Sequence, residues 1–107
     1  MFVKNAECTV TPCEPGVSRK ILAWSDALMM VEVTFEAGAS GNIHGHVHEQ
    51  VTYVGMGRFD FTIDGETREV GKGDSVHIPS GAQHGVKALE AGILVDVFNP
   101  KREEFLK

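Results

Sequence analysis

Residues 41–50 read GNIHGHVHEQ and hold three of the five histidines in this chain of 107 residues. The three histidines are each two positions apart, and Gln50 follows His48 at the same interval. A β-strand directs every second side chain to one face, so an extended segment would bring His44, His46 and Gln50 toward one point. A bulge or bend near Val47 would decide whether His48 joins that point or turns away from it.

Residues 73–84, which read GDSVHIPSGAQH, form a second segment of this kind, in which His84 follows a Pro-x-Gly turn. Neutral imidazoles combined with an oxygen donor are a common ligand set for a divalent transition metal. His77 alternates with Val76 and Ile78, so we expect it to face the other side, in a surface or packing role. The two segments together predict a small barrel that holds one metal ion.

The rest of the chain has the alternation that is typical of β-strands. Val31, Val33 and Phe35 share one face of a predicted strand, and Asp64-Gly65 between two alternating runs is a strong hairpin signal. No stretch has a sustained helical period. We therefore predict an all-β fold of about ten short antiparallel strands, either a closed barrel or a two-sheet jelly roll. The expected strands outside the first histidine segment are residues 18–24, 27–35, 50–55, 58–63, 66–70, 75–78, 84–89 and 92–98.

The length favours one domain over residues 1–107, because neither half would retain a core. We expect residues 1–16 to be an arm with one short strand that pairs with the body or with a second subunit. The tail at residues 99–107 would form a helical turn or lie across the barrel mouth. Cys8 and Cys13 are too few for a disulfide framework, and we expect two free thiols.

The net charge of -5 and the scattered lysines and arginines argue against nucleic acid or an anionic membrane as a partner. The N-terminus has no signal-peptide pattern, and no apolar stretch approaches the roughly 20 residues of a membrane span. From the sequence we expect a soluble cytoplasmic protein.

The two histidine segments together resemble the two-part signature of the cupins. Five residues separate Gly38 from His44, as in the first part of that signature. Gln50 stands where glutamate is usual. The other matching positions are His46 and Gly57 in the first part, and Gly73, Pro79, Gly81 and His84 in the second. The resemblance implies a cupin jelly-roll β-barrel. It also implies that His44, His46, Gln50 and His84 are the ligands of one divalent ion, which could be Zn, Ni, Mn, Fe or Co. Alternatively, these side chains are polar residues in the lumen of a cupin that has lost its metal.

Gln50 in place of a carboxylate has a consequence for the charge of this site. Three neutral imidazoles and a neutral amide leave the full charge of a divalent ion in place. Such a site should bind an anionic, chelating ligand well and act as a strong Lewis acid. This favours a carboxylate-bearing substrate and acid/base chemistry over oxygen activation.

Residues 46–54 and 94–106 resemble the small cupins associated with pectin and alginate breakdown. Those proteins convert 4,5-unsaturated uronate monomers into linear 5-keto-4-deoxyuronates, and an Asp and an Arg near the C-terminus accompany their metal. The matching residues here are Asp96 and Arg102. The resemblance implies an isomerase or ring-opening enzyme whose metal would hold the substrate carboxylate and a neighbouring oxygen. It also implies a small anionic carbohydrate as the substrate and, because small cupins are often dimers, a homodimer.

Asp96 lies in an apolar strand, where burial would raise the pKa of its carboxyl group toward a value useful for proton transfer. Its alternation with Val95 and Val97 also allows an outward-facing position. Arg102 could pair with the substrate carboxylate, or it could be a solvated residue of the tail. Phe98 shares a face with Asp96 and would either line the pocket or pack in the core, whereas we expect Tyr53 to have a packing role.

Two other functions are compatible with the same ligands. The first is a cupin dioxygenase with Fe at this site, which oxygen uptake would reveal. The second is a non-catalytic cupin that contains a metal and binds a small molecule or a sugar.

Overall fold

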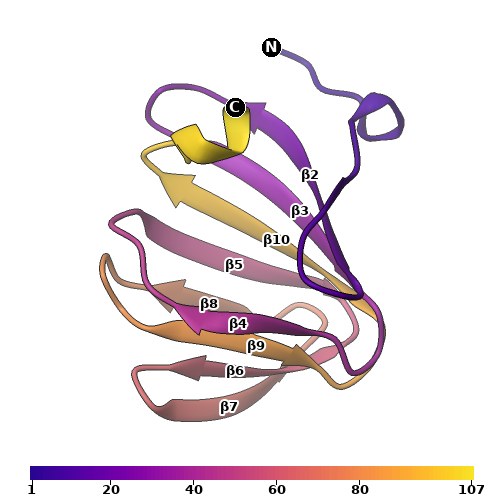
Figure 1. The fold of residues 1–107 in the computed structure, drawn as a ribbon, viewed down its shortest axis with the longest axis vertical. Coiled ribbons are helices and arrows are strands. Elements are labelled where there is room, and N and C mark those ends of the chain that lie inside the picture. The colour runs from indigo at the N-terminus through magenta and orange to yellow at the C-terminus, as the bar shows by residue number, and fades with distance from the viewer.

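Ten short strands form two antiparallel sheets, which account for most of the chain (Figure 1). The computed structural model describes all residues from 1 to 107. The strands are β1 (Thr11–Pro12), β2 (Val17–Trp24), β3 (Met29–Phe35), β4 (Ser40–His44), β5 (Glu49–Met56), β6 (Arg58–Ile63), β7 (Glu66–Gly71), β8 (Ser75–Ile78), β9 (His84–Ala88) and β10 (Gly92–Asn99). Two short 3₁₀ helices, η1 (Asn5–Glu7) and η2 (Glu103–Leu106), lie near the ends.

The six-stranded sheet has the order β1-β2-β3-β10-β5-β8, and the four-stranded sheet has the order β4-β9-β6-β7. Every pairing within both sheets is antiparallel. The predicted all-β fold of about ten short antiparallel strands is confirmed. The predicted bounds agree with β6 and β8, whereas β2, β3, β5, β7, β9 and β10 differ from their predicted ranges by one or two residues at one or both ends.

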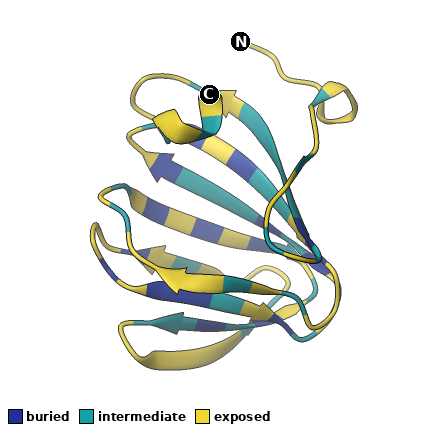
Figure 2. Cartoon of the chain, viewed as in Figure 1, coloured by how far each residue is buried: buried dark blue, intermediate teal, exposed yellow.

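The hydrophobic core lies between the two sheets. β5 shows why, because Gln50, Thr52 and Val54 are buried while Val51 and Tyr53 between them are exposed (Figure 2). The main core cluster combines side chains of both sheets: Val17, Phe35, Val54, Phe59, Phe61, Ile78, Ala82, Ala88 and Leu94. A smaller cluster of Met29, Val31 and Phe98 lies on the inner face of the six-stranded sheet. Alternation along each strand thus gives an inner face that is available for a core and a site.

Both ends of the chain pack against the body of the fold. The arm supplies β1, which pairs with β2 of the same chain, and Cys8 and Cys13 are both free. The tail forms η2, and Phe105 on this helix packs against Phe98 with ring centroids 6.0 Å apart. The tail therefore covers part of the inner face of the larger sheet. No helix in the structure is long and apolar enough to cross a membrane.

Candidate metal centre and the cavity around it

Two neighbouring strands place His44 and His84 side by side. His44 ends β4 and His84 begins β9, and the antiparallel register pairs them directly. Directly opposed residues of an antiparallel pair project to the same face. Their ring centroids are 4.6 Å apart, and both residues line a cavity between the sheets.

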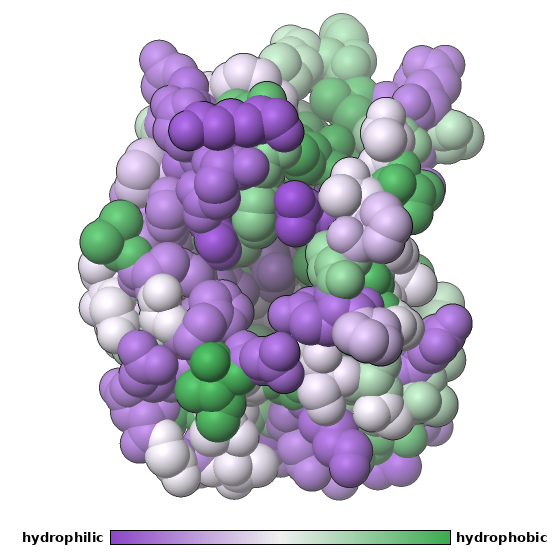
Figure 3. All heavy atoms as spheres, in the orientation of Figure 1, coloured by the Kyte–Doolittle hydropathy of each residue, from purple (hydrophilic) through white to green (hydrophobic).

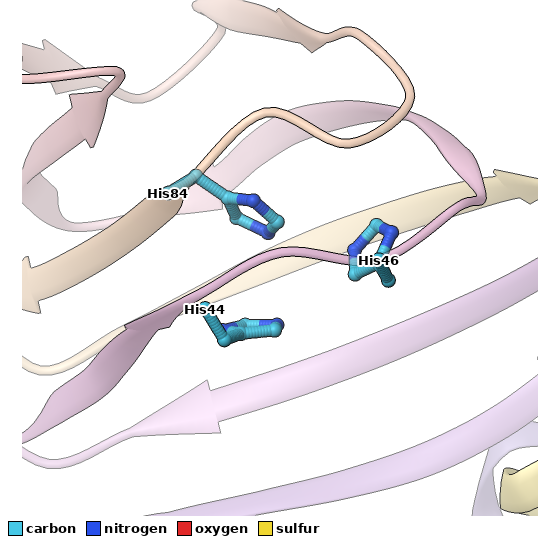
Figure 4. A group of neighbouring side chains, drawn as sticks. All are labelled: His44, His46 and His84. Atoms are coloured by element: carbon cyan, nitrogen blue, oxygen red, sulfur yellow. The ribbon is translucent and has the colours of Figure 1, made fainter.

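His46 reaches the same point from the loop that follows β4. The strand ends at His44 and the chain bends at Val47 and His48, so the extended geometry considered for this segment does not continue beyond His44. The His46 ring nevertheless lies 5.6 Å from that of His44 and 4.9 Å from that of His84, measured between centroids. Figure 4 shows the three rings converging, and their candidate ligand atoms lie within 4.8 Å of one another.

The corner at residues 79–81 holds this loop in position. The backbone N–H of Gly81 donates to the carbonyl of His46 at 2.8 Å, and the Ser80 hydroxyl donates to the carbonyl of Val47. Gly81 has a φ of 80°, which is a conformation that glycine adopts without strain. The Pro-x-Gly turn of the second segment thus positions a histidine of the first segment as well as its own.

The bend at Val47 and His48 turns His48 away from the cluster. Its ring packs against His46 and Phe98, with centroid distances of 5.5 and 6.4 Å, and its Nδ1 is buried without a hydrogen-bond partner. It is not a member of the group of converging ligand atoms. His48 instead offers its backbone carbonyl to the Nδ1 of His46 at 2.9 Å.

All three clustered histidines use Nδ1 in the same way. The Nδ1 atoms of His44, His46 and His84 lie 2.8, 2.9 and 3.1 Å from the backbone carbonyl oxygens of Asn42, His48 and Ala82. Since a carbonyl only accepts, each Nδ1 carries the proton and each neutral ring keeps its lone pair on Nε2. Backbone contacts therefore select the tautomer in which Nε2 is the ligand atom.

Gln50 completes this group from β5. Its side-chain amide donates to the Thr52 hydroxyl at 2.8 Å, which leaves Oε1 only 3.1 Å from Nε2 of His46. With the proton of His46 on Nδ1, its Nε2 and the Oε1 of Gln50 are both hydrogen-bond acceptors. They face each other inside the protein, and neither can donate a hydrogen bond to the other. A cation bound between them would satisfy both, so the three histidines and Gln50 fit a divalent transition metal.

The surroundings of His46 and His84 favour their neutral form. Burial is the main cause that lowers the pKa of His46 and of His84, and the positive charge of Arg102 also contributes to both shifts. A lowered pKa means that these imidazoles are unprotonated near pH 7, which is the form that binds a metal. The cluster of His44, His46 and His84 is therefore compatible with a divalent metal.

Asp96 on β10 faces inward, toward the same cavity. Its register partners are Val31 and Thr52, both of which are buried on the inner face. The Thr52 hydroxyl donates to Oδ1 of Asp96 at 2.7 Å, so a chain of hydrogen bonds connects Gln50 to this carboxyl group. The residue retains some accessible surface toward the cavity, but burial of its carboxyl group raises the pKa from 3.8 to about 6, and the bond from Thr52 opposes this shift.

Arg102 is held at the cavity wall and is not a freely solvated tail residue. Its side chain is 13% exposed, and its Nε donates to Oε1 of Glu104 at 2.6 Å. The guanidinium carbon lies 4.4 Å from the ring centroid of Phe105 and 5.1 Å from that of Phe98. These contacts direct the group toward the cavity, where its positive charge partly opposes the rise that burial causes in the pKa of Asp96.

One cavity of about 550 Å³ lies between the two sheets, and its lining includes His44, Gln50, His84, Asp96 and Arg102. Figure 3 shows a hollow near the middle of the displayed face, with hydrophilic side chains around it. Apolar side chains such as Val33, Phe61 and Leu94 form much of the remaining wall. An apolar cavity with a few convergent polar groups is the usual form of a small-molecule site.

Of the other candidates, His77 faces outward as its alternation predicted, Tyr53 is exposed and not packed as expected, and Phe98 faces the cavity. His77 is exposed and pairs with Glu49, with Nε2 and Oε2 2.8 Å apart. Tyr53 lies on the outer face and is 51% exposed, so it does not contact the cavity. Phe98 is buried, lines the cavity and packs against His46 with the ring centroids 5.7 Å apart.

Sequence reasoning missed three residues of this site: Thr52, Arg19 and Phe105. Thr52 follows Gln50 at the strand interval, and this spacing was a usable signal for a shared face. Arg19 lies two residues from both Val17 and Ile21, so the same strand interval indicates that the three side chains share a face. Nothing in the local sequence indicates that Phe105 contacts Arg19, because these residues come from opposite ends of the chain.

Comparison with known proteins agrees with this geometry. Residues 31–98 match the model of the cupin domain. The chain is 47% identical over 93 residues to the pectin degradation protein KdgF of Dickeya dadantii, covering 85% of this chain and 84% of that protein. The solved structure of KdgF from Halomonas sp. superimposes with a TM-score of 0.93 at 38% identity, covering 98% of this chain and 97% of that one. An RmlC-like cupin from Shewanella frigidimarina gives a TM-score of 0.94 at 36% identity, with 97% and 94% coverage.

Proposed function

The chain belongs to the cupin family, and from this membership we propose that it is a metal-dependent enzyme of pectin or alginate breakdown. The proposed reaction opens the ring of 4,5-unsaturated uronate monomers to give linear 5-keto-4-deoxyuronates. The observation that carries the proposal is the position of Asp96, an inward carboxyl group that faces the same cavity as the histidine cluster. The similarity to two proteins named KdgF, one of them described as a pectin degradation protein, supports the same substrate class.

Four side chains are proposed to hold the ion: His44, His46, Gln50 and His84. A divalent ion held there would supply Lewis-acid chemistry toward oxygen atoms of the substrate. The ligand set does not choose among Zn, Ni, Mn, Fe and Co. Because all four donors are neutral, they do not repel an anionic substrate.

Asp96 is proposed to move the proton that ring opening requires. Its pKa of about 6 makes it mainly a carboxylate at pH 7, which is the form that accepts the proton of the anomeric hydroxyl. Loss of this proton allows the bond between C1 and the ring oxygen to break, and an aldehyde forms at C1 and an enolate at C5. Asp96 then delivers the same proton to C4, and the enolate becomes a ketone. The reaction is an isomerisation, so no oxidant or further reactant is needed.

Arg102 is proposed to bind the carboxylate of the substrate. Its Nε is engaged by Glu104, which leaves the terminal nitrogens available as donors. The rings of Phe98 and Phe105 hold the guanidinium group in place. A rigidly held arginine of this kind favours a planar, anionic group.

The direct test follows the ultraviolet absorbance of the unsaturated-uronate band in monomer digests. Purified protein loaded with a divalent ion should remove the band faster than the spontaneous rate, and a chelator should abolish the gain. Asp96→Ala should lower the catalysed rate by about 10²–10⁴-fold while metal stays bound. Unchanged turnover in this variant would refute the assignment of Asp96.

The alternatives predict different results in the same samples. A dioxygenase would consume oxygen when it is loaded with Fe, and a binding protein would retain a sugar acid without converting it. Background decay of the band with metal bound would therefore exclude the proposed reaction and lead to oxygen-uptake measurements.

We also propose that the protein is a homodimer. The outer face of the six-stranded sheet carries apolar side chains in register, with Val97 opposite both Met30 and Val51, and Val95 opposite Tyr53. Met30, Val51 and Tyr53 are 39, 46 and 51% exposed. Exposed apolar side chains that lie together favour a protein–protein contact.

A further inference from the structure

An arginine on the inner face of β2 has no anionic partner. Arg19 pairs in register with Val33, whose side chain lines the cavity, and Arg19 lines the same cavity. None of the ion pairs in the structure includes this residue. Its Nε is buried without a hydrogen-bond partner, and one terminal nitrogen donates only to the sulfur of Cys13, at 3.6 Å.

The position of Arg19 without an anionic partner lowers the stability of the fold unless a ligand supplies that partner. Arg19 is half-buried, and a buried donor such as its Nε is unfavourable without a partner, because it has lost its hydrogen bond to water. Glu14 and Asp96 also line the cavity, yet neither forms an ion pair with Arg19. The guanidinium group thus has an unused capacity for an anion, and it faces the cavity in which the substrate is proposed to bind.

Arg19 and Arg102 share one aromatic ring. The guanidinium carbon of Arg19 lies 4.0 Å from the ring centroid of Phe105, and that of Arg102 lies 4.4 Å from the same centroid. Two cations that contact one phenyl ring are close enough to be reached by a single small molecule. Phe105 thereby brings a residue of β2 and a residue of the tail to one end of the cavity.

We propose that Arg19 is a substrate-binding residue that, together with Arg102, clamps the carboxylate of a uronate. A carboxylate has two oxygens and about four acceptor positions, so it can accept from both guanidinium groups. This inference rests on the proposed function for the identity of the sugar acid. It adds that the recognition of the negative charge depends on two arginines from distant parts of the chain.

The test compares Arg19→Gln and Arg19→Lys with the control Lys20→Gln. Lys20 is the next residue of β2 and bonds to Asn5, so the control removes one cation without touching the cavity. Calorimetry on the metal-loaded proteins would measure binding of galacturonate and of its methyl ester. Galacturonate carries the carboxylate but lacks the C4–C5 double bond, so it cannot undergo the proposed reaction. In parallel, KM and kcat would be measured with the unsaturated uronate.

For Arg19→Gln we expect the affinity for galacturonate to fall about ten- to a hundredfold, as for the loss of a charged hydrogen bond. Affinity for the ester should be unchanged, and Arg19→Lys should lie between Arg19→Gln and the wild type. With the unsaturated uronate, KM should rise while kcat changes little. The thermal midpoint of ligand-free Arg19→Gln should equal or exceed that of the wild type, because an unpaired cation has been removed. A purely structural role for Arg19 would lower this midpoint.

Two outcomes separate this inference from the proposed function. In the first outcome, the wild type does not convert unsaturated uronates but binds galacturonate better than its ester, and Arg19→Gln abolishes that preference. This result would refute the proposed ring-opening activity and support carboxylate binding by Arg19 and Arg102. If the wild type shows no preference for the acid, or if Arg19→Gln weakens acid and ester equally, the clamp is refuted, whatever the turnover.

Discussion

Gln50 occupies a position at which a carboxylate would change both the metal site and the proton-transfer group. Its amide nitrogen donates to Thr52, and Thr52 in turn donates to Asp96. A glutamate would have no proton to donate at neutral pH, so the Thr52 hydroxyl would face two carboxylates while it can donate to only one. The neutral amide therefore supports the cluster and Asp96 at the same time.

For Gln50→Glu we expect tighter metal binding and poorer use of the anionic substrate. The added negative charge attracts the ion but repels the uronate, and KM should rise about tenfold or more. Metal affinity would be measured by competition with a coloured chelator, and KM by the ultraviolet assay. Gln83→Glu is the matched control, because Gln83 is the other glutamine of the chain and is exposed. If Gln50→Glu and Gln83→Glu changed metal affinity and KM equally, the net charge of the protein and not the position of Gln50 would explain the result.

Asp96 should make the metal-free protein less stable as the pH rises. Its pKa is about 6 in the folded chain and 3.8 in the unfolded reference, so between these values the folded state binds more protons than the unfolded state. The free energy of unfolding should therefore fall by about 2 kcal/mol between pH 4 and pH 7 relative to Asp96→Asn, and the difference should level off above pH 6.

This comparison would use urea unfolding at several pH values in the presence of a chelator. His46 and His84 have lowered pKa values and contribute the opposite trend, since their stabilisation is complete above pH 6.5 and is lost as the pH falls. They are present in both proteins, so they largely cancel in the difference. A difference that does not vary with pH would mean that Asp96 has an ordinary pKa.

At the scale of elements, the tail is part of the site. η2 brings Phe105 against Phe98 on β10 and against the guanidinium groups of Arg19 and Arg102. The cavity thus has walls from β2, β3, β4, β5, β6, β9 and β10 and one from a short helix near the C-terminus. A segment with few residues controls the orientation of both proposed carboxylate-binding groups.

Phe105→Ala should therefore impair substrate binding more than folding. Loss of the ring frees both guanidinium groups, and we expect KM to rise several-fold, with a cost in stability of about 2 kcal/mol for a half-buried aromatic side chain. Steady-state kinetics and thermal unfolding would measure the two effects. Leu106→Ala, at the next and more exposed position of η2, is the control and should change neither value greatly. If KM stays at the wild-type value in Phe105→Ala, the ring does not position the arginines.

At the scale of the whole molecule, the two faces of the larger sheet have different roles. The inner face holds the cavity and core, whereas the outer face presents the apolar row of Met30, Val97 and Val51. Alternation within the same strands supplies both faces. The proposed site and the proposed dimer contact are thus on opposite sides of one sheet.

Val51→Glu should convert the proposed dimer into a monomer. A charge in the centre of an apolar contact is desolvated without a partner, which opposes association. Sedimentation velocity over a range of protein concentrations would determine the mass. Thr67→Glu on the smaller sheet adds the same charge at an exposed position and should leave the mass unchanged. A wild-type protein that is a monomer at every concentration would refute the dimer.

The sequence by itself determined the strands, the shared face of alternate residues such as Asp96 and Phe98, and the spacing of the histidines, because alternation and turn residues are local properties. The structure decided that Asp96 faces inward. Only the tertiary structure decided which strands are neighbours. This pairing puts His44 opposite His84, brings backbone carbonyls to the three Nδ1 atoms, and links Gln50 to Asp96 through Thr52. It also joins Arg19 to Phe105 across most of the length of the chain. Contacts of this kind depend on register and on the path of the tail over the inner face of the larger sheet, and no local pattern of residues encodes either of them.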